Sequence, residues 1–449
     1  MNALTTFTVK PAGVPLQLGM FLCFSLMGIY WVRVLNLGSF SLEAYHVGLL
    51  AIVAMTGISV YSPWAVVAVF RRCMPWFIAW LAYLLLLVPA LAGSQAMSLL
   101  LKQTLFISGF VCIAAYFYRA SDPATSLRRG AIAGILLYLA FTEYSAQLIG
   151  KSIVGAVVEF FSTGSFKALI FGFFRPVFNS LEDGTDLAFV ASLTNSIAVS
   201  LLVLALCFRA GRRREGIDLV GSAVLLAVLT LALLLNARSV VMVGVAAMAL
   251  ALAVRLVAAR AIALVELFYW SVVAIGLMTA VTMIAITSPS AVESVTEVFR
   301  FEDNSAESRL EQYAWAFGLI EDQLLLGHGY VETDKGLPIH NLFLSSWAYT
   351  GVFGFVLILV FYVGLLVSWL RWLALTLSRP SSWMLGVRPE WVSVLPVLPL
   401  FRVWISGAGG MPAYGEWIAL GVFVGLVMRN EREKSEIKLN RYGNNSGLI

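Results

Sequence analysis

The residue that first suggests chemistry is His340, one of three histidines in the chain. It is followed by Asn341 and, after nine further residues, by the glycines Gly351 and Gly354. An imidazole with an unperturbed pKa of about 6.5 can accept a proton from a weak hydroxyl nucleophile at neutral pH. We therefore predict that His340 acts as a general base and that Asn341 orients its ring or a bound sugar.

A second set of candidates consists of arginines predicted to lie on the outer side of the membrane or within a span, where the positive-inside rule does not favour them. They are Arg238, Arg300, Arg309 and Arg402. A charge at membrane depth or at the outer interface is costly and often functional, and the guanidinium fork binds phosphate oxygens bidentately. These arginines could form a pocket that binds phosphate or pyrophosphate, and Arg238 is the sharpest case because it lies in a short turn between two strongly apolar spans. Side chains that snorkel or pair locally are the alternative. This alternative is preferred for Arg33, Lys102 and Arg300, and the two interpretations are balanced for Arg402.

The elements that must position these groups are membrane helices. The 449 residues are 60% hydrophobic and 12% charged, whereas a soluble domain carries about 25% charged residues. Apolar runs recur along the chain at about the 20 residues that cross a bilayer, so we predict an all-α polytopic membrane protein with about 12 transmembrane helices. The spans are expected near residues 16–37, 45–70, 74–93, 97–118, 129–148, 187–208, 217–236, 239–258, 261–287, 341–371, 392–409 and 412–428.

Arginine clusters fix the predicted orientation. With these spans, every cluster falls in loops on one side, which the positive-inside rule makes cytoplasmic, together with both termini. The clusters contain Arg71, Arg72, Arg119, Arg128, Arg129, Arg209, Arg212, Arg213, Arg214, Arg255, Arg260, Arg371, Arg379, Arg388, Arg429, Arg432 and Lys434.

Two longer segments then face outward, at about 149–186 and 288–340. The second is expected to hold a helix from Ala306 to Gln323, with Ser305 as N-cap and a break at the Gly327-His328-Gly329 turn. The predicted apolar face of this helix comprises Leu310, Tyr313, Ala314, Phe317 and Ile320. Residues 1–428 are predicted to form one transmembrane catalytic domain, and residues 429–449 a charged, disordered cytoplasmic tail.

The His-Asn pair followed by Gly-x-x-Gly resembles the signature of bacterial O-antigen ligases and the related polymerases of surface polysaccharide. The upstream residues Arg309 and Trp315 and the glycines Gly327 and Gly329 resemble the outer loop of that family. Asn236-Ala237-Arg238-Ser239 resembles the turn that carries the family's other arginine, although alanine stands where many members have serine. The resemblance covers roughly residues 236–354.

This resemblance implies that a glycan is transferred from an undecaprenyl-pyrophosphate carrier to an acceptor hydroxyl at the periplasmic face of the bacterial inner membrane. The arginines would then neutralise the pyrophosphate leaving group, with Asn341, Arg402, Trp315 and Arg300 binding substrate. Gly351 and Gly354 would allow close helix approach or room for lipid, or would serve only packing. Other polysaccharide assembly proteins are the expected partners, besides the glycan substrates and membrane lipid.

The acceptor is left open by the motif. A polymerase joins repeat units of O-antigen or exopolysaccharide, which we prefer, whereas a ligase transfers the glycan to lipid A-core. A transporter or flippase for lipid-linked sugars would also have many spans, but transporters usually show paired halves with matching broken helices, and no such symmetry is evident. A non-catalytic scaffold would leave the histidine and arginines unexplained.

No cofactor, metal or nucleic acid is predicted. The sequence has no phosphate-binding Gly-x-x-x-x-Gly-Lys-Ser/Thr motif. Glu302, Asp303 and Glu307 lie close together, but their spacing fits no known cation loop and favours a solvated acidic surface. The family resemblance likewise implies a metal-independent reaction.

Overall fold

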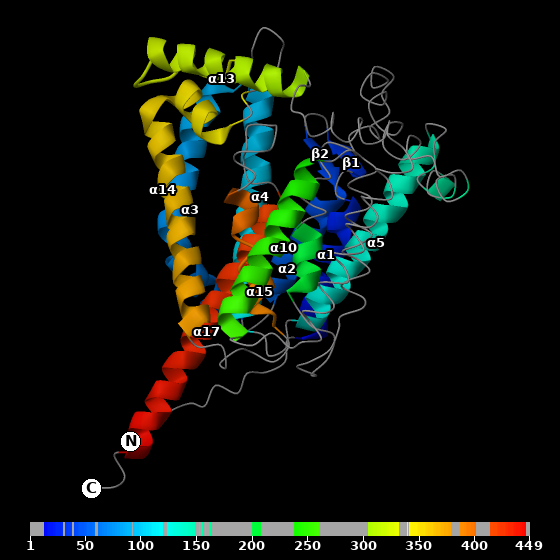
Figure 1. Cartoon of the computed structure of the whole chain (residues 1–449), viewed down its shortest axis with the longest axis vertical. Coiled ribbons are helices and arrows are strands. Elements are labelled where there is room, and N and C mark those ends of the chain that lie inside the picture. Colours follow the sequence, from blue (N-terminus) through cyan, green and yellow to red (C-terminus); the bar gives the residue numbers. More distant parts are fainter. Residues whose placement is uncertain are drawn as a thin grey trace.

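A computed structural model of the chain is a bundle of long helices, with one further helix, α13, lying across one end (Figure 1). The model describes residues 13–29, 32–37, 40–58, 62–91, 93–119, 124–148, 200–207, 238–259, 304–331, 341–378, 387–400 and 414–445, and the single positions 152, 154, 155, 158, 162 and 339.

Three described helical segments are long and apolar enough to cross a membrane: Pro63–Leu87, Met97–Arg119 and Leu342–Ala374. Mostly helical structure with such segments is what the sequence predicts for an all-α membrane protein. The predicted total of about twelve spans includes 217–236 and 261–287, which lie outside the described residues, as does almost all of the outer segment 149–186.

The first predicted span, 16–37, is too long. Helix α1 (Val14–Leu26) continues only through the short 3-10 helix η1 (Met27–Ile29). Strands β1 (Arg33–Leu37) and β2 (Phe40–Glu43) then form an antiparallel hairpin in which Arg33 pairs in register with Glu43. Arg33 thus lies in a strand and not near the end of a membrane helix.

The predicted boundary between the second and third spans is also wrong. Helix α2 covers Ala44–Ile58, and α3 runs without interruption from Ser62 to Leu87, so Arg71 and Arg72 lie within a helix and not in a loop. Both arginines are exposed, and Arg72 Nη2 lies 3.1 Å from Glu431 Oε1. A long side chain that reaches a counter-ion or water lets a helix carry these charges.

The remaining elements follow the predicted order more closely. They are η2 (Val88–Ala90), α4 (Gly93–Arg119), α5 (Ala124–Leu148), α10 (Arg238–Ala259), α13 (Asn304–Asp322), α14 (Leu342–Ser378), α15 (Pro389–Val392) and α17 (Tyr414–Asn445). The predicted disorder of the tail from Arg429 is wrong as far as Asn445, because α17 continues there. Its Arg, Glu and Lys residues favour helix.

An aromatic cluster holds α3, α4, α14 and α17 together. Trp80 lies 5.0 Å from Phe361 and 5.7 Å from Trp417 between ring centroids, and Phe110 lies 5.9 Å from Trp417. All four rings are at most 1% exposed. Tilted and edge-on aromatic pairs of this kind stabilise a packed core.

Pairs of glycines four residues apart bring two helix pairs into close contact. On α17, a Cβ at Gly421 would lie 2.9 Å from the Phe110 carbonyl oxygen, and one at Gly425 would lie 2.5 Å from that of Ala114, both on α4. On α5, Gly130 and Gly134 lie equally close to α1. Small residues at this spacing let helix backbones approach closely in membranes.

The end of the bundle that lies opposite α13 (Figure 1) is called the basic end here, because several arginines of α3, α4, α14 and α17 lie there. Arg432 and Arg119 both lie over the ring of Tyr118, at 5.1 and 5.8 Å from its centroid. Arg371 lies near Arg72 and Glu431 around one cavity. The predicted one-sided clustering of arginines is therefore seen in α3, α4, α14 and α17.

Candidate active site

Helix α13 carries Arg309 and lies across the end of the bundle, against α14 (Figure 1). The prediction of a helix over 306–323 is confirmed, but most of its apolar stripe is not buried. Leu310 and Phe317 are 69% and 53% exposed, and the buried residues are Gln312, Ala316 and Ile320. These recur every four residues, so a narrow stripe meets α14 while apolar side chains face outward.

The turn after α13 docks on α14 through three backbone hydrogen bonds. The N–H groups of His328 and Gly329 donate to the carbonyls of Ala348 and Tyr349, at 2.8 and 3.0 Å. In return, Val352 N–H donates to the Leu324 carbonyl at 3.2 Å. The two glycine motifs, whose first glycines Gly327 and Gly351 are 24 residues apart in the chain, thus form one structural unit.

A backbone break at Gly351 makes this docking possible. Gly351 has φ 70° and ψ −169°, which interrupts the helical path of α14, and a Cβ there would overlap the Leu325 carbonyl. The break takes the Ala348 and Tyr349 carbonyls away from their usual helical donors, and the turn supplies new ones. Gly351 therefore serves a loop-to-helix contact, which differs from the predicted helix approach or lipid space.

The other motif glycines have separate roles. Gly327 and Gly329 have φ of 71° and 78°, a region that favours glycine. A Cβ on Gly327 would lie 2.5 Å from the Gly351 nitrogen. Gly354 is buried, and a Cβ there would overlap the Thr350 hydroxyl. Thr350 Oγ1 in turn donates to the Ser346 carbonyl at 2.6 Å.

Tyr349 connects this unit to the residue before His340. Its hydroxyl accepts a hydrogen bond from the Ile339 N–H at 3.4 Å, and its ring lies 5.2 Å from that of Tyr330. Ile339 is completely buried. Trp347 donates from Nε1 to the Leu324 carbonyl at 3.2 Å and adds a side-chain contact between the turn and α14.

Asn341, on the other side of His340, caps α14. Its Oδ1 accepts hydrogen bonds from the N–H groups of Phe343 and Leu344, at 2.9 and 3.2 Å. The side chain is only 4% exposed. Asparagine at this position satisfies the free N–H groups of a first helical turn. Its oxygen is therefore already used, and its amide nitrogen is the group that remains for a sugar or the imidazole.

His328 lies close to an acid. Its Nε2 is 3.1 Å from Asp322 Oδ2, at the last residue of α13, and the carboxylate is largely exposed. A charged pair forms there when the imidazole is protonated. The pair links the end of α13 to the motif turn.

The structure brings some predicted site residues together and does not describe others. Trp315 is partly buried and packs against the core, and Lys102 Nζ lies 3.9 Å from Glu43 Oε1 as a local ion pair. For Arg238 and Arg309 only the helical backbone is described: Arg238 begins α10, and Arg309 lies in the second turn of α13. The predicted residues that lie wholly outside the described part are Arg300, His340 and Arg402.

Sequence reasoning missed Tyr349 and Trp347. Both stand between Asn341 and Gly351, inside the motif's nine-residue spacer, and nothing in that spacer distinguishes them from lipid-facing aromatics. Among the described residues, no group of three His, Cys, Asp or Glu side chains is arranged to hold a metal ion.

Comparison with known proteins places these features within one family domain. Residues 223–359 match the family model described as O-antigen ligase. No curated protein matches the chain. The matched residues include the start of α10, all of α13, the docked turn and the break in α14. The match confirms the resemblance to the O-antigen ligase and polymerase family.

Proposed function

Because this chain carries the O-antigen ligase family domain over residues 223–359, we propose that it polymerises surface polysaccharide, O-antigen or exopolysaccharide, at the outer face of the bacterial inner membrane. The donor is a glycan on an undecaprenyl-pyrophosphate carrier, and the acceptor is a sugar hydroxyl of another repeat unit. The family match carries this proposal, since it spans Arg238, Arg309 and His340.

The reaction exchanges one glycosidic bond for another. The acceptor oxygen attacks the anomeric carbon of the donor sugar, and the bond from that carbon to the pyrophosphate breaks. The bonding electrons leave with the lipid pyrophosphate, and the acceptor proton passes to His340. Since pyrophosphate is already a good leaving group, it needs charge stabilisation more than protonation.

Arg238 and Arg309 supply that stabilisation in this proposal. Each belongs to a helix at the α13 end: Arg238 begins α10, and Arg309 lies in α13. The N-terminus of a helix favours bound anions, and guanidinium adds a bidentate fork. Arg300 and Arg402 are proposed as further contacts to the substrate.

His340 accepts the proton, and its neighbours favour a fixed position for it. Ile339 is buried and bonded to Tyr349, and Asn341 is buried and caps α14. A catalytic base must be held within hydrogen-bond reach of its proton. The docked glycine unit is thus proposed to position His340 and to take no part in the chemistry itself.

The length of α14 supports a site at one membrane face. Gly351 and Arg371 are 20 residues apart, which corresponds to about 30 Å of helix and to the thickness of the hydrocarbon core. The break at Gly351 would therefore lie at one face of the membrane if the basic end lies at the other face. Exposed Leu324, Leu325 and Leu326 lie beside the turn and suit a lipid-linked donor.

The second candidate is a ligase that transfers the glycan to lipid A-core, which the family's description as O-antigen ligase favours. The two activities share the donor and differ in acceptor. A deletion strain complemented with wild type or His340→Ala distinguishes them, with glycan chain length and lipid attachment resolved on gels. Single repeat units in the variant indicate a polymerase, and long chains left on the carrier lipid indicate a ligase. Wild-type glycan with His340→Ala would contradict both.

A further inference from the structure

The basic end contains a cavity that the proposed reaction does not use. It has a volume of about 200 Å³ and is lined by residues of α3, α14 and α17. It lies on the far side of the bundle from α13. Since one water accounts for about 30 Å³ of liquid, the cavity has room for a phosphate headgroup but not for acyl chains.

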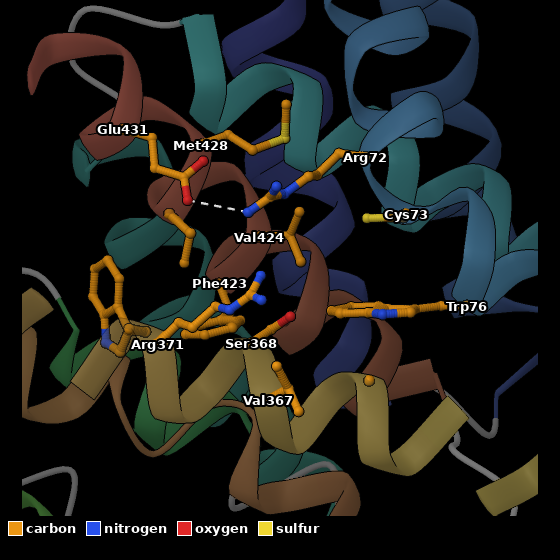
Figure 2. Close-up of a pocket in the computed structure, with 13 residues that line it drawn as sticks. Arg72, Cys73, Trp76, Val367, Ser368, Arg371, Phe423, Val424, Met428 and Glu431 are labelled. Carbon is orange, nitrogen blue, oxygen red and sulfur yellow. Dashed lines mark hydrogen bonds and ion pairs between the residues drawn. The ribbon is translucent and has the colours of Figure 1, made fainter. Parts of the chain in front are cut away.

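One cation at this cavity is left over after the ion pairs are assigned. Arg72 is paired with Glu431 at 3.1 Å, which neutralises the only acid in the lining. Arg371 directs its guanidinium into the same space (Figure 2). Within the described part of the chain, no acidic side chain lies within 4.0 Å of Arg371 to pair with it. The Ser368 hydroxyl, one turn away, is a second polar group in the wall.

The rest of the lining is apolar. Trp76, Phe423 and Val424 form much of the wall. Gly364 lets the edge of Trp76 lie against α14, since a Cβ there would be 2.5 Å from the indole nitrogen. Exposed apolar side chains also lie along α3 and α14, two of the helices that form the wall. They are Phe70, Met74, Ile78, Val360, Val363 and Val367.

From this arrangement we propose that the cavity binds the phosphate headgroup of an anionic glycerophospholipid at the basic end. Arg371 and Ser368 contact the phosphate, and the acyl chains lie on the apolar surfaces of α3 and α14. A basic pocket between helices at the membrane surface recognises a lipid by this combination of charge and apolar area. The pocket requires neither Arg238 nor Arg309, and so it stands apart from the glycan-transfer site.

The test uses the full chain purified in detergent, and native mass spectrometry to measure bound phosphatidylglycerol and phosphatidylcholine with the same acyl chains. Wild type is expected to bind phosphatidylglycerol at least about tenfold more tightly than phosphatidylcholine, a difference that corresponds to roughly 1.4 kcal/mol of binding free energy. Arg371→Gln should remove this preference. Arg129→Gln, an exposed arginine on α5 outside the cavity, should retain it. Glu431→Gln should strengthen binding, because it removes the acid and frees Arg72.

Equal binding of the two lipids by wild type would overturn the proposal. An equal loss of the preference for phosphatidylglycerol in Arg371→Gln and Arg129→Gln would overturn it as well. Displacement of phosphatidylglycerol by millimolar inorganic phosphate would also overturn it, because the site would then be one for a free anion. The thermal unfolding midpoint without added lipid serves as the folding control. None of these outcomes depends on glycan transfer.

Discussion

Gly351→Ala should release the motif turn from α14. An alanine at φ 70° and ψ −169° costs roughly 1–3 kcal/mol, because these angles are almost restricted to glycine. Its Cβ would also overlap the Leu325 carbonyl, so the turn must move away. Such a movement breaks at least one of the three backbone hydrogen bonds, each worth about 0.5–1.5 kcal/mol. The expected loss is about 2–5 kcal/mol of local stability.

Hydrogen–deuterium exchange measures this loss directly. Since a tenfold change corresponds to about 1.4 kcal/mol, amide exchange in peptides covering 324–331 should accelerate at least about 30-fold. Gly318→Ala is the matched control. Gly318 lies within α13, nothing lies within 4 Å of its added Cβ, and alanine favours the helix. Unchanged exchange in Gly351→Ala would refute the conclusion that glycine at this break permits docking.

Three further predictions concern the site and its sidedness. Arg238→Ala and Arg309→Ala should each abolish glycan transfer while the protein inserts normally, and lysine at either position should rescue poorly because it lacks the guanidinium fork. Wild-type glycan levels in either variant would remove the substituted arginine from the mechanism. A cysteine at Asp334 should react with membrane-impermeant reagents from outside the membrane and one at Arg213 should not, and the reverse pattern would invert the proposed topology. Tyr349→Phe should lower kcat about 2–10-fold with little change in KM, as expected for loss of one hydrogen bond that positions the base; a change in KM alone would place Tyr349 in substrate binding.

The sequence predicted α13 well because its signals are local. A polar N-terminal residue, helical spacing and a glycine turn place its ends to within two residues of Asn304 and Asp322. The spacing did not show which apolar residues are buried: Ile320 is buried, whereas Leu310 and Phe317 are exposed. A helix lying across the end of a membrane bundle can instead present its apolar residues to the interface.

The errors at Arg71–Arg72 and at the tail share another cause. Charged residues were taken as ends of helices, but α3 and α17 carry them through. Arg72 and Glu431, 359 residues apart in the chain, form an ion pair between these two helices. A partner so distant in sequence cannot be identified from either segment alone.

Gly351 illustrates the same limit within the motif. Its spacing from Gly354 suggested helix packing, whereas the structure gives Gly351 a backbone break that receives the turn at Gly327–Gly329. The pattern located the right residues. Their role depends on a contact between two motif halves that no local signal records.

The most direct test of glycan transfer is release of undecaprenyl pyrophosphate by the purified chain in liposomes. The liposomes contain lipid-linked repeat units as donor and acceptor, and the released lipid is separated from the glycan-bearing lipid by chromatography. We expect wild type to release the pyrophosphate and form longer glycans, and His340→Ala to do neither while retaining the donor. Donor that crosses the bilayer with its glycosidic bond intact would instead identify a transporter and contradict the proposed function.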